Sequence, residues 1–64
     1  MNISGDKIKS LRNVFGVNQK QLAKRVKISQ GYLARLEQGR QTPSIAIAGR
    51  IASAFGLTVE KICK

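Results

Sequence analysis

The sequence predicts an all-α fold, a compact single domain of five short helices over residues 1–64. Apolar residues recur every three or four positions in successive segments, as on one face of a helix, whereas the alternation typical of strands hardly appears. Helix-capping residues precede these segments, and glycines follow most of them. A chain of this length allows one small core, and no linker is long enough to divide it.

The first helix is predicted over residues 5–15. Its apolar face repeats at three and four residues and consists of Ile8, Leu11 and Phe15. Ser4 can cap its start, and Gly16 lies just after the last apolar position, where a left-handed residue ends many helices.

The second and third helices are predicted over residues 19–26 and 30–37. Asn18 and Gln21 form a capping-box pattern before the second helix, and Ser29 can cap the third. The inward positions of this unit are apolar and consist of Leu22, Ala23, Val26, Ile28, Leu33 and Leu36. Two short helices with such faces across a tight connection form a helix-turn-helix, although an ordinary helical hairpin shows the same pattern.

The last two helices are predicted over residues 45–55 and 59–63. Either Thr42 or Ser44 can cap the first of them, and Thr58 can cap the second. The apolar face of the longer helix consists of Ile45, Ala48, Ile51, Ala52 and Phe55. The residues expected to close the core from the final helix are Val59, Ile62 and Cys63.

The chain carries a strong positive charge. Twelve Lys and Arg residues against three Asp and Glu residues give a formal charge of +9, and the pI is about 10.7. The basic residues are spread along the chain, and solubility needs less charge than this in so small a domain. A folded surface with this charge attracts polyanions, so nucleic acid is the favoured partner.

The residue inventory argues against an enzyme, a metal site or a cofactor. The chain has no histidine, and its single cysteine, Cys63, cannot form an internal disulfide and has no evident base beside it. Asp6 and Glu60 lie at opposite ends of the chain, and no glycine-rich phosphate loop occurs. Because neither a membrane-spanning segment nor a signal-peptide pattern is present, we expect a cytoplasmic protein with no membrane partner.

The order and spacing of several motifs resemble one family. This chain contains the stretch "LRNVFGVNQKQLAKRVKISQGYLARLEQGRQTPS" followed by "IASAFGLTVEKI". These motifs resemble the helix-turn-helix domain of the phage repressor and Cro family, also called the XRE family. The resemblance extends from about Gly5 to Ile62, and its motifs are specific only in combination. It implies a five-helix, lambda-repressor-like domain that binds double-stranded operator DNA as a homodimer and regulates transcription, as a repressor.

The resemblance assigns roles by position. The residues that would face the bases of the major groove are Ser29, Gln30, Gly31 and Arg35. Gln30 could bond N6 and N7 of an adenine and Arg35 O6 and N7 of a guanine, each pair discriminating by about 1–3 kcal/mol. The residues expected at the DNA backbone are Gln19, Lys20, Lys27, Tyr32, Arg40 and Thr42.

Some of these roles have alternatives. Gln19 could be a solvated first-turn residue, Arg35 could reach a phosphate instead of a base, and the Tyr32 ring could pack against the second helix. Glu37 is expected to anchor the fold through a salt bridge to a nearby arginine, because an acid in the groove would repel phosphate.

Two positions depart from the family pattern. Related turns have glycine where this chain has Lys27, which either takes the left-handed conformation at a cost of about 1 kcal/mol or changes the turn. Related domains carry a side chain where this chain has Gly31. Either the third helix sits deeper in the groove there, or the protein reads one base pair fewer.

A homodimer is expected because two recognition helices one DNA turn apart read a palindrome. The expected interface combines the last helix with the loop before the fourth and lies around Ile45, Ile47, Val59, Lys61 and Ile62. Of these, Ile47 lies off the apolar face in a position that looks exposed. The alternative function is an antitoxin or adaptor module of the same fold that acts mainly through a protein partner.

Overall fold

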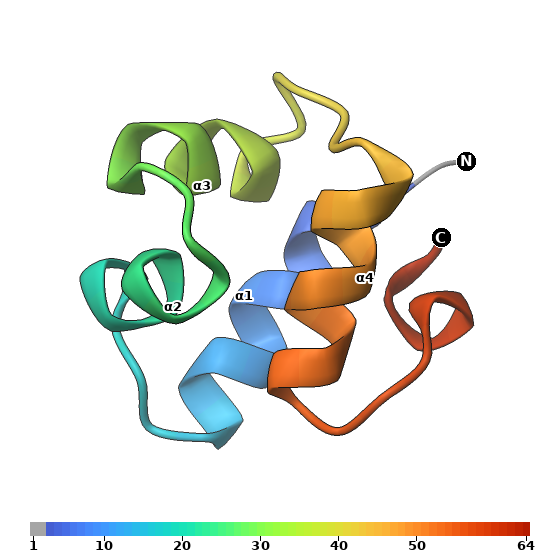
Figure 1. The fold of residues 1–64 in the computed structure, drawn as a ribbon, viewed down its shortest axis with the longest axis horizontal. Coiled ribbons are helices and arrows are strands. Elements are labelled where there is room, and N and C mark those ends of the chain that lie inside the picture. Colours follow the sequence, from blue (N-terminus) through green and yellow to red (C-terminus); the bar gives the residue numbers. More distant parts are fainter. Residues whose placement is uncertain (1–2) are drawn as a thin grey trace.

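The computed structural model describes residues 3–64 and contains four α-helices and one turn of 3-10 helix around a single core (Figure 1). These elements are α1 (Gly5–Val14), α2 (Gln19–Val26), α3 (Gln30–Glu37), α4 (Ile45–Ala54) and the 3-10 helix η1 (Val59–Ile62). α2 packs on α3 and on α4, α1 packs on α3, and η1 packs on α4. Within residues 3–64 the only β-type pairing is an isolated antiparallel bridge between Ile3 and Cys63.

The predicted count of five α-helices is wrong at the C-terminal end. Val59–Ile62 forms a single 3-10 turn instead of a helix over residues 59–63, and the Thr58 side chain makes no capping hydrogen bond. Four residues are enough for one i to i+3 turn but too few for a ladder of α-helical bonds. α1 and α4 each end one residue earlier than predicted.

Side-chain caps define the helix starts as predicted. Each α-helix begins after a residue whose side chain accepts a backbone hydrogen bond of 2.8–3.2 Å, and these caps are Ser4, Asn18, Ser29 and Ser44. Ser44, and not Thr42, therefore caps α4. The Asn18 amide also donates to the Gln21 side chain at 2.9 Å, which completes the capping box. The glycines with positive φ that follow helix ends are Gly16, Gly39 and Gly56.

The core consists mostly of the residues predicted to face inward. Its largest fully buried side chains are Ile8, Leu22, Val26, Leu33, Ile51 and Ile62. Phe15 departs from the prediction, because it is 54% exposed. Its ring packs edge-on against Phe55, with ring centroids 5.0 Å apart. Cys63 is half-buried, and its thiol donates to the carbonyl oxygen of Val59 at 3.3 Å.

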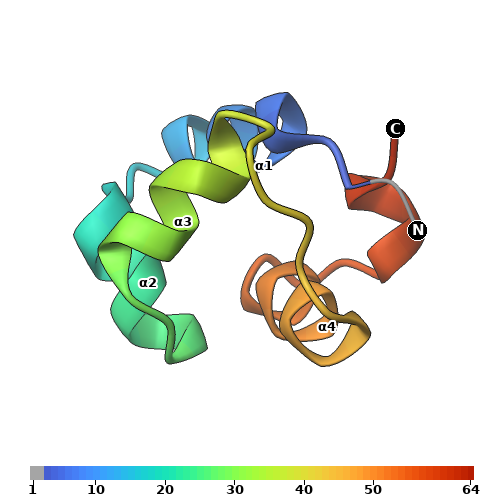
Figure 2. The ribbon, with the colours of Figure 1, turned by 90° about the horizontal axis from the view of Figure 1, so that it is seen from above.

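The two ends of the described chain lie together. The Ser4 amide donates to the Ile62 carbonyl oxygen at 2.8 Å, and the Lys7 ammonium donates to the Cys63 carbonyl oxygen at 2.6 Å. Figure 2 shows both ends of the described chain at the opposite side of the domain from α3. Between residues 3 and 64, none of the helices combines the length and the apolar character that crossing a membrane requires.

Candidate nucleic-acid interface

α2 and α3 form a helix-turn-helix. Buried residues of both helices face each other across the connection, and they are Leu22, Ala23 and Val26 on α2 with Leu33 and Leu36 on α3. In the turn between them, Lys27 has φ 61° and ψ 47°, so the left-handed alternative is the observed one. A β-carbon in this conformation crowds the neighbouring carbonyl, which costs about 1 kcal/mol relative to glycine.

The first turns of α3 present an exposed polar surface. Ser29, Gln30, Gly31 and Arg35, the residues predicted to contact bases, are all exposed. The Ser29 oxygen accepts the Tyr32 amide as the helix cap, which leaves its hydroxyl proton free to donate outward. Among the described residues the Gln30 side chain has no hydrogen-bond partner, so both its donor and its acceptor are available to a base edge.

Arg35 is held in place by two neighbours and passes close to Gly31. Its Nε donates to Gln41 Oε1 at 3.1 Å, and its guanidinium carbon lies 5.9 Å from the centroid of the Tyr32 ring, within cation–π range. Its Nη1 would lie 3.6 Å from a β-carbon placed on Gly31. The guanidinium therefore lies along the helix beside the glycine, with both terminal amino groups still available for a bidentate contact.

The residues predicted to contact the DNA backbone surround this surface. Lys20, Lys27, Arg40 and Thr42 are exposed, and Tyr32 and Gln19 are half-buried. Tyr32 packs against the core, and its ring lies within cation–π range of Arg35. Its contact with DNA stays a prediction.

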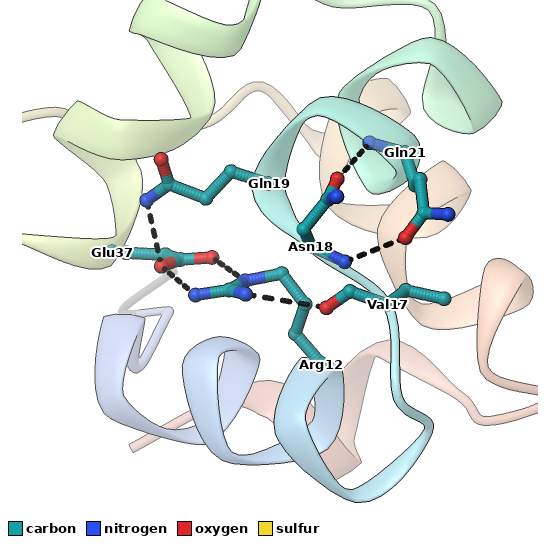
Figure 3. Close-up of polar contacts among 6 residues, drawn as sticks. All are labelled: Arg12, Val17, Asn18, Gln19, Gln21 and Glu37. Atoms are coloured by element: carbon teal, nitrogen blue, oxygen red, sulfur yellow. Dashed lines mark hydrogen bonds and ion pairs between the residues drawn. The ribbon is translucent and has the colours of Figure 1, made fainter.

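Gln19 belongs to a polar cluster that also contains Arg12 and Glu37 (Figure 3). Glu37 accepts hydrogen bonds from Arg12 Nε at 2.8 Å, from Arg12 Nη2 at 3.1 Å and from Gln19 Nε2 at 3.1 Å. Arg12 Nη1 also donates to the carbonyl oxygen of Val17 at 3.2 Å. The cluster ties the beginning of α2 to α1 and to the end of α3, and it confirms the expected salt bridge of Glu37.

Burial of this ion pair is nearly complete. The Arg12 and Glu37 side chains are only 11% and 4% exposed. The hydrogen bond to Glu37 raises the pKa of the Arg12 guanidinium above its ordinary value, against the opposite effect of burial. Because Glu37 is buried and paired with Arg12, it presents no carboxylate on the exposed surface of α3.

Two residues that form hydrogen bonds with the predicted site residues were not predicted from the sequence, and they are Arg12 and Gln41. Arg12 follows Ile8 by four residues and so lies on the buried side of α1, where a charge needs a partner, and this signal could have identified it. Gln41 has no comparable signal, because its contact with Arg35 depends on the path of the loop between α3 and α4.

The proposed dimer residues differ widely in exposure. Ile45 is 72% exposed, and Val59 is half-buried. Ile47 was expected to be exposed, but it is half-buried and packs against the core. Ile62 has no exposed surface, so it is a core residue that cannot itself contact a second copy. η1 turns Ile62 inward against α4, which the apolar spacing alone did not reveal.

Comparison with known proteins identifies the class of this domain. Residues 8–62 match the helix-turn-helix family HTH_3. An uncharacterized HTH-type transcriptional regulator of Archaeoglobus fulgidus is 38% identical over 56 residues, which cover 88% of this chain and 79% of that protein. The immunity repressor protein of Bacillus phage phi105 is 36% identical over 58 residues, 91% of this chain but only 40% of the repressor.

A solved structure has the same arrangement of helices. The structure of SinR, a master regulator for biofilm formation, in complex with DNA superposes with a TM-score of 0.85 and 25% identity, over 91% of this chain and 94% of that chain. The chain therefore belongs to the HTH_3 family, which confirms the predicted resemblance to the XRE class. Its class is that of DNA-binding transcriptional regulators.

Proposed function

We propose that this protein is a homodimeric repressor that reads a palindromic operator with α3 in the major groove. The observation that carries the proposal is the exposed surface at the start of α3, where Gln30 and Arg35 are accessible and no carboxylate is exposed. The similarity to a phage immunity repressor supports repression as the outcome.

The geometry suggests a role for each contact. Gln30 pairs with an adenine, and the terminal amino groups of Arg35 pair with a guanine while its Nε stays on Gln41. Gln19 keeps one amide hydrogen on Glu37 and offers the other to a phosphate at the N-terminus of α2. The remaining phosphate contacts come from Lys20, Lys27, Arg40 and Thr42.

Selection of bound sequences from a random DNA pool at near-physiological salt tests base recognition. A palindromic motif is expected. Gln30→Ala and Arg35→Ala should each relax the preference at one position per half-site, by about 1–3 kcal/mol. Lys20→Ala is the matched control, because loss of a phosphate contact weakens all sequences alike. A selection without any motif would contradict the proposal.

The salt dependence of binding separates this proposal from the antitoxin or adaptor alternative. Contacts with several phosphates should make the DNA affinity fall steeply as the salt concentration rises. A protein interface built on apolar contacts should respond little. If the affinity of the protein for its tightest-binding partner hardly changes with salt concentration, the antitoxin or adaptor alternative is favoured.

The dimer is testable at Ile45, the most exposed apolar residue of the proposed interface. Ile45→Asp should weaken cooperative binding to a palindromic duplex but leave the affinity for one half-site unchanged. Asn13→Asp is the control, because it adds the same negative charge at an exposed site on α1 that is not part of the proposed interface. Sedimentation that shows only a monomer on a palindromic duplex would refute the dimer.

A further inference from the structure

A second cationic feature lies between α2 and α4. Arg25 and Lys27 at the end of α2, together with Arg50, Ser53 and Ala54 of α4, line a cleft of about 350 Å³. These two helices pack on each other. No residue of α3 lines this cleft, so it is separate from the surface that is proposed to read bases.

The charge of the cleft is not balanced within the described chain. The protein has only three carboxylate side chains, and they belong to Asp6, Glu37 and Glu60. None of them lines the cleft, and the single ion pair among residues 3–64 lies elsewhere. Three like charges around one cavity repel one another, and an anion in the cavity would remove this repulsion.

The positions of the cations exclude one simpler explanation. Arg25 and Lys27 lie near the negative end of the α2 dipole, which by itself favours cations there. Arg50 lies in the middle of α4, where the helix dipole offers no such benefit. The helix dipole therefore accounts for Arg25 and Lys27 but not for Arg50 on the other side of the cleft.

We propose that this cleft binds a phosphate group. Two guanidinium groups provide planar pairs of N–H donors that match phosphate oxygens, and Lys27 and the Ser53 hydroxyl add single donors. The phosphate belongs either to a small molecule or to a nucleic-acid backbone, and both present the same oxygens to the cleft.

Titration of the isotope-labelled protein with pyrophosphate at constant ionic strength tests the small-molecule source. The NMR signals of Arg25, Arg50 and Ser53 should shift and saturate. Arg50→Gln should weaken the affinity about tenfold, as expected for loss of a charged hydrogen-bond donor. Lys9→Gln is the control, because it removes the same charge from an exposed site on α1 outside the cleft.

The backbone source is tested with duplex DNA and the same variants. If a backbone phosphate occupies the cleft, Arg50→Gln should lower the slope of log affinity against log salt by about one more than Lys9→Gln does. Equal pyrophosphate affinities and equal DNA slopes for the two variants would overturn the proposal.

Folding of the variants gives an independent check. Since Arg50 is exposed and repelled by its neighbours, Arg50→Gln should melt at or above the temperature of the wild type at low salt. Arg25→Gln provides a second variant for both titrations. The test of base recognition uses Gln30 and Arg35, so failure of one proposal leaves the other standing.

Discussion

Glu37→Gln tests the buried cluster that joins α1, α2 and α3. The substitution keeps the shape of the side chain but removes its negative charge. Arg12 remains charged because the ordinary pKa of arginine lies far above neutral pH, and its guanidinium is only 11% exposed. The variant therefore leaves a buried cation beside a neutral amide.

The magnitude follows from the hydrogen bonds of Glu37. Its two oxygens accept three bonds, two from Arg12 and one from Gln19, whereas a glutamine at this position has one oxygen. Removing one partner of a buried ion pair costs about 3–5 kcal/mol. A chain of this length has a free energy of unfolding of about 3–10 kcal/mol, so the substitution removes a large part of the total.

Urea denaturation followed by circular dichroism at neutral pH provides the assay, with Glu37→Gln, Arg12→Met and the double variant. The raised pKa of Arg12 means that its contribution is complete below the ordinary pKa of arginine and is lost only as the pH rises through the folded-state value. Neutral pH therefore measures the pair in full.

The double variant should be more stable than the sum of the single effects predicts, by about 2 kcal/mol or more, because it leaves no unpaired charge. Glu60→Gln is the control on an exposed site, and its effect should stay within about 0.5 kcal/mol. A cost below about 1 kcal/mol for Glu37→Gln, or additive single effects, would refute this reasoning.

Three further predictions concern backbone positions, and thermal unfolding measures each. Gly49→Ala should stabilise α4 by about 0.5–1 kcal/mol, because nothing lies within 4 Å of the added carbon. Gly5→Ala should cost about 2 kcal/mol or more, because its added carbon would overlap backbone atoms at the end of α3. Equal effects of the two substitutions on stability would contradict this contrast. Lys27→Gly should relieve the left-handed strain and leave stability unchanged or raised by up to about 1 kcal/mol, and a lower melting temperature would argue against strain. Gly31→Ala should stabilise the fold, since the new carbon makes an ordinary contact of 3.6 Å with Arg35, and a destabilised variant would contradict this. If the stabilised variant still binds the operator, the protein reads one base pair fewer at this position. If it loses binding, the third helix approaches the DNA closely there.

Sequence patterns predicted the parts of the fold that local chemistry determines. Cap residues act on amides two or three positions away, so Ser4 and Ser29 reveal helix starts without knowledge of the fold. The final segment differs, because apolar spacing over four residues does not distinguish a 3-10 turn from an α-helix, and Thr58 has the chemistry of a cap but makes no bond.

The candidate site was predictable to a similar extent. The spacing of apolar residues along α3 identifies Gln30 and Arg35 as exposed, and both side chains are exposed in the structure. Their partners depend on how segments distant in sequence come together, and neither the contact of Arg35 with Gln41 nor that of Gln19 with Glu37 follows from spacing. The same dependence on packing explains why Ile62 is a core residue and not an interface residue.

The bridge between Ile3 and Cys63 holds the two ends of the described chain next to each other. A short flexible linker could join the two ends, and new ends could be opened in the exposed loop between α3 and α4 without breaking a helix. A module joined at either end of the described chain would also leave the domain from the same side, away from α3 (Figure 2). The architecture therefore provides one attachment point for additional modules that does not obstruct the surface proposed to face DNA.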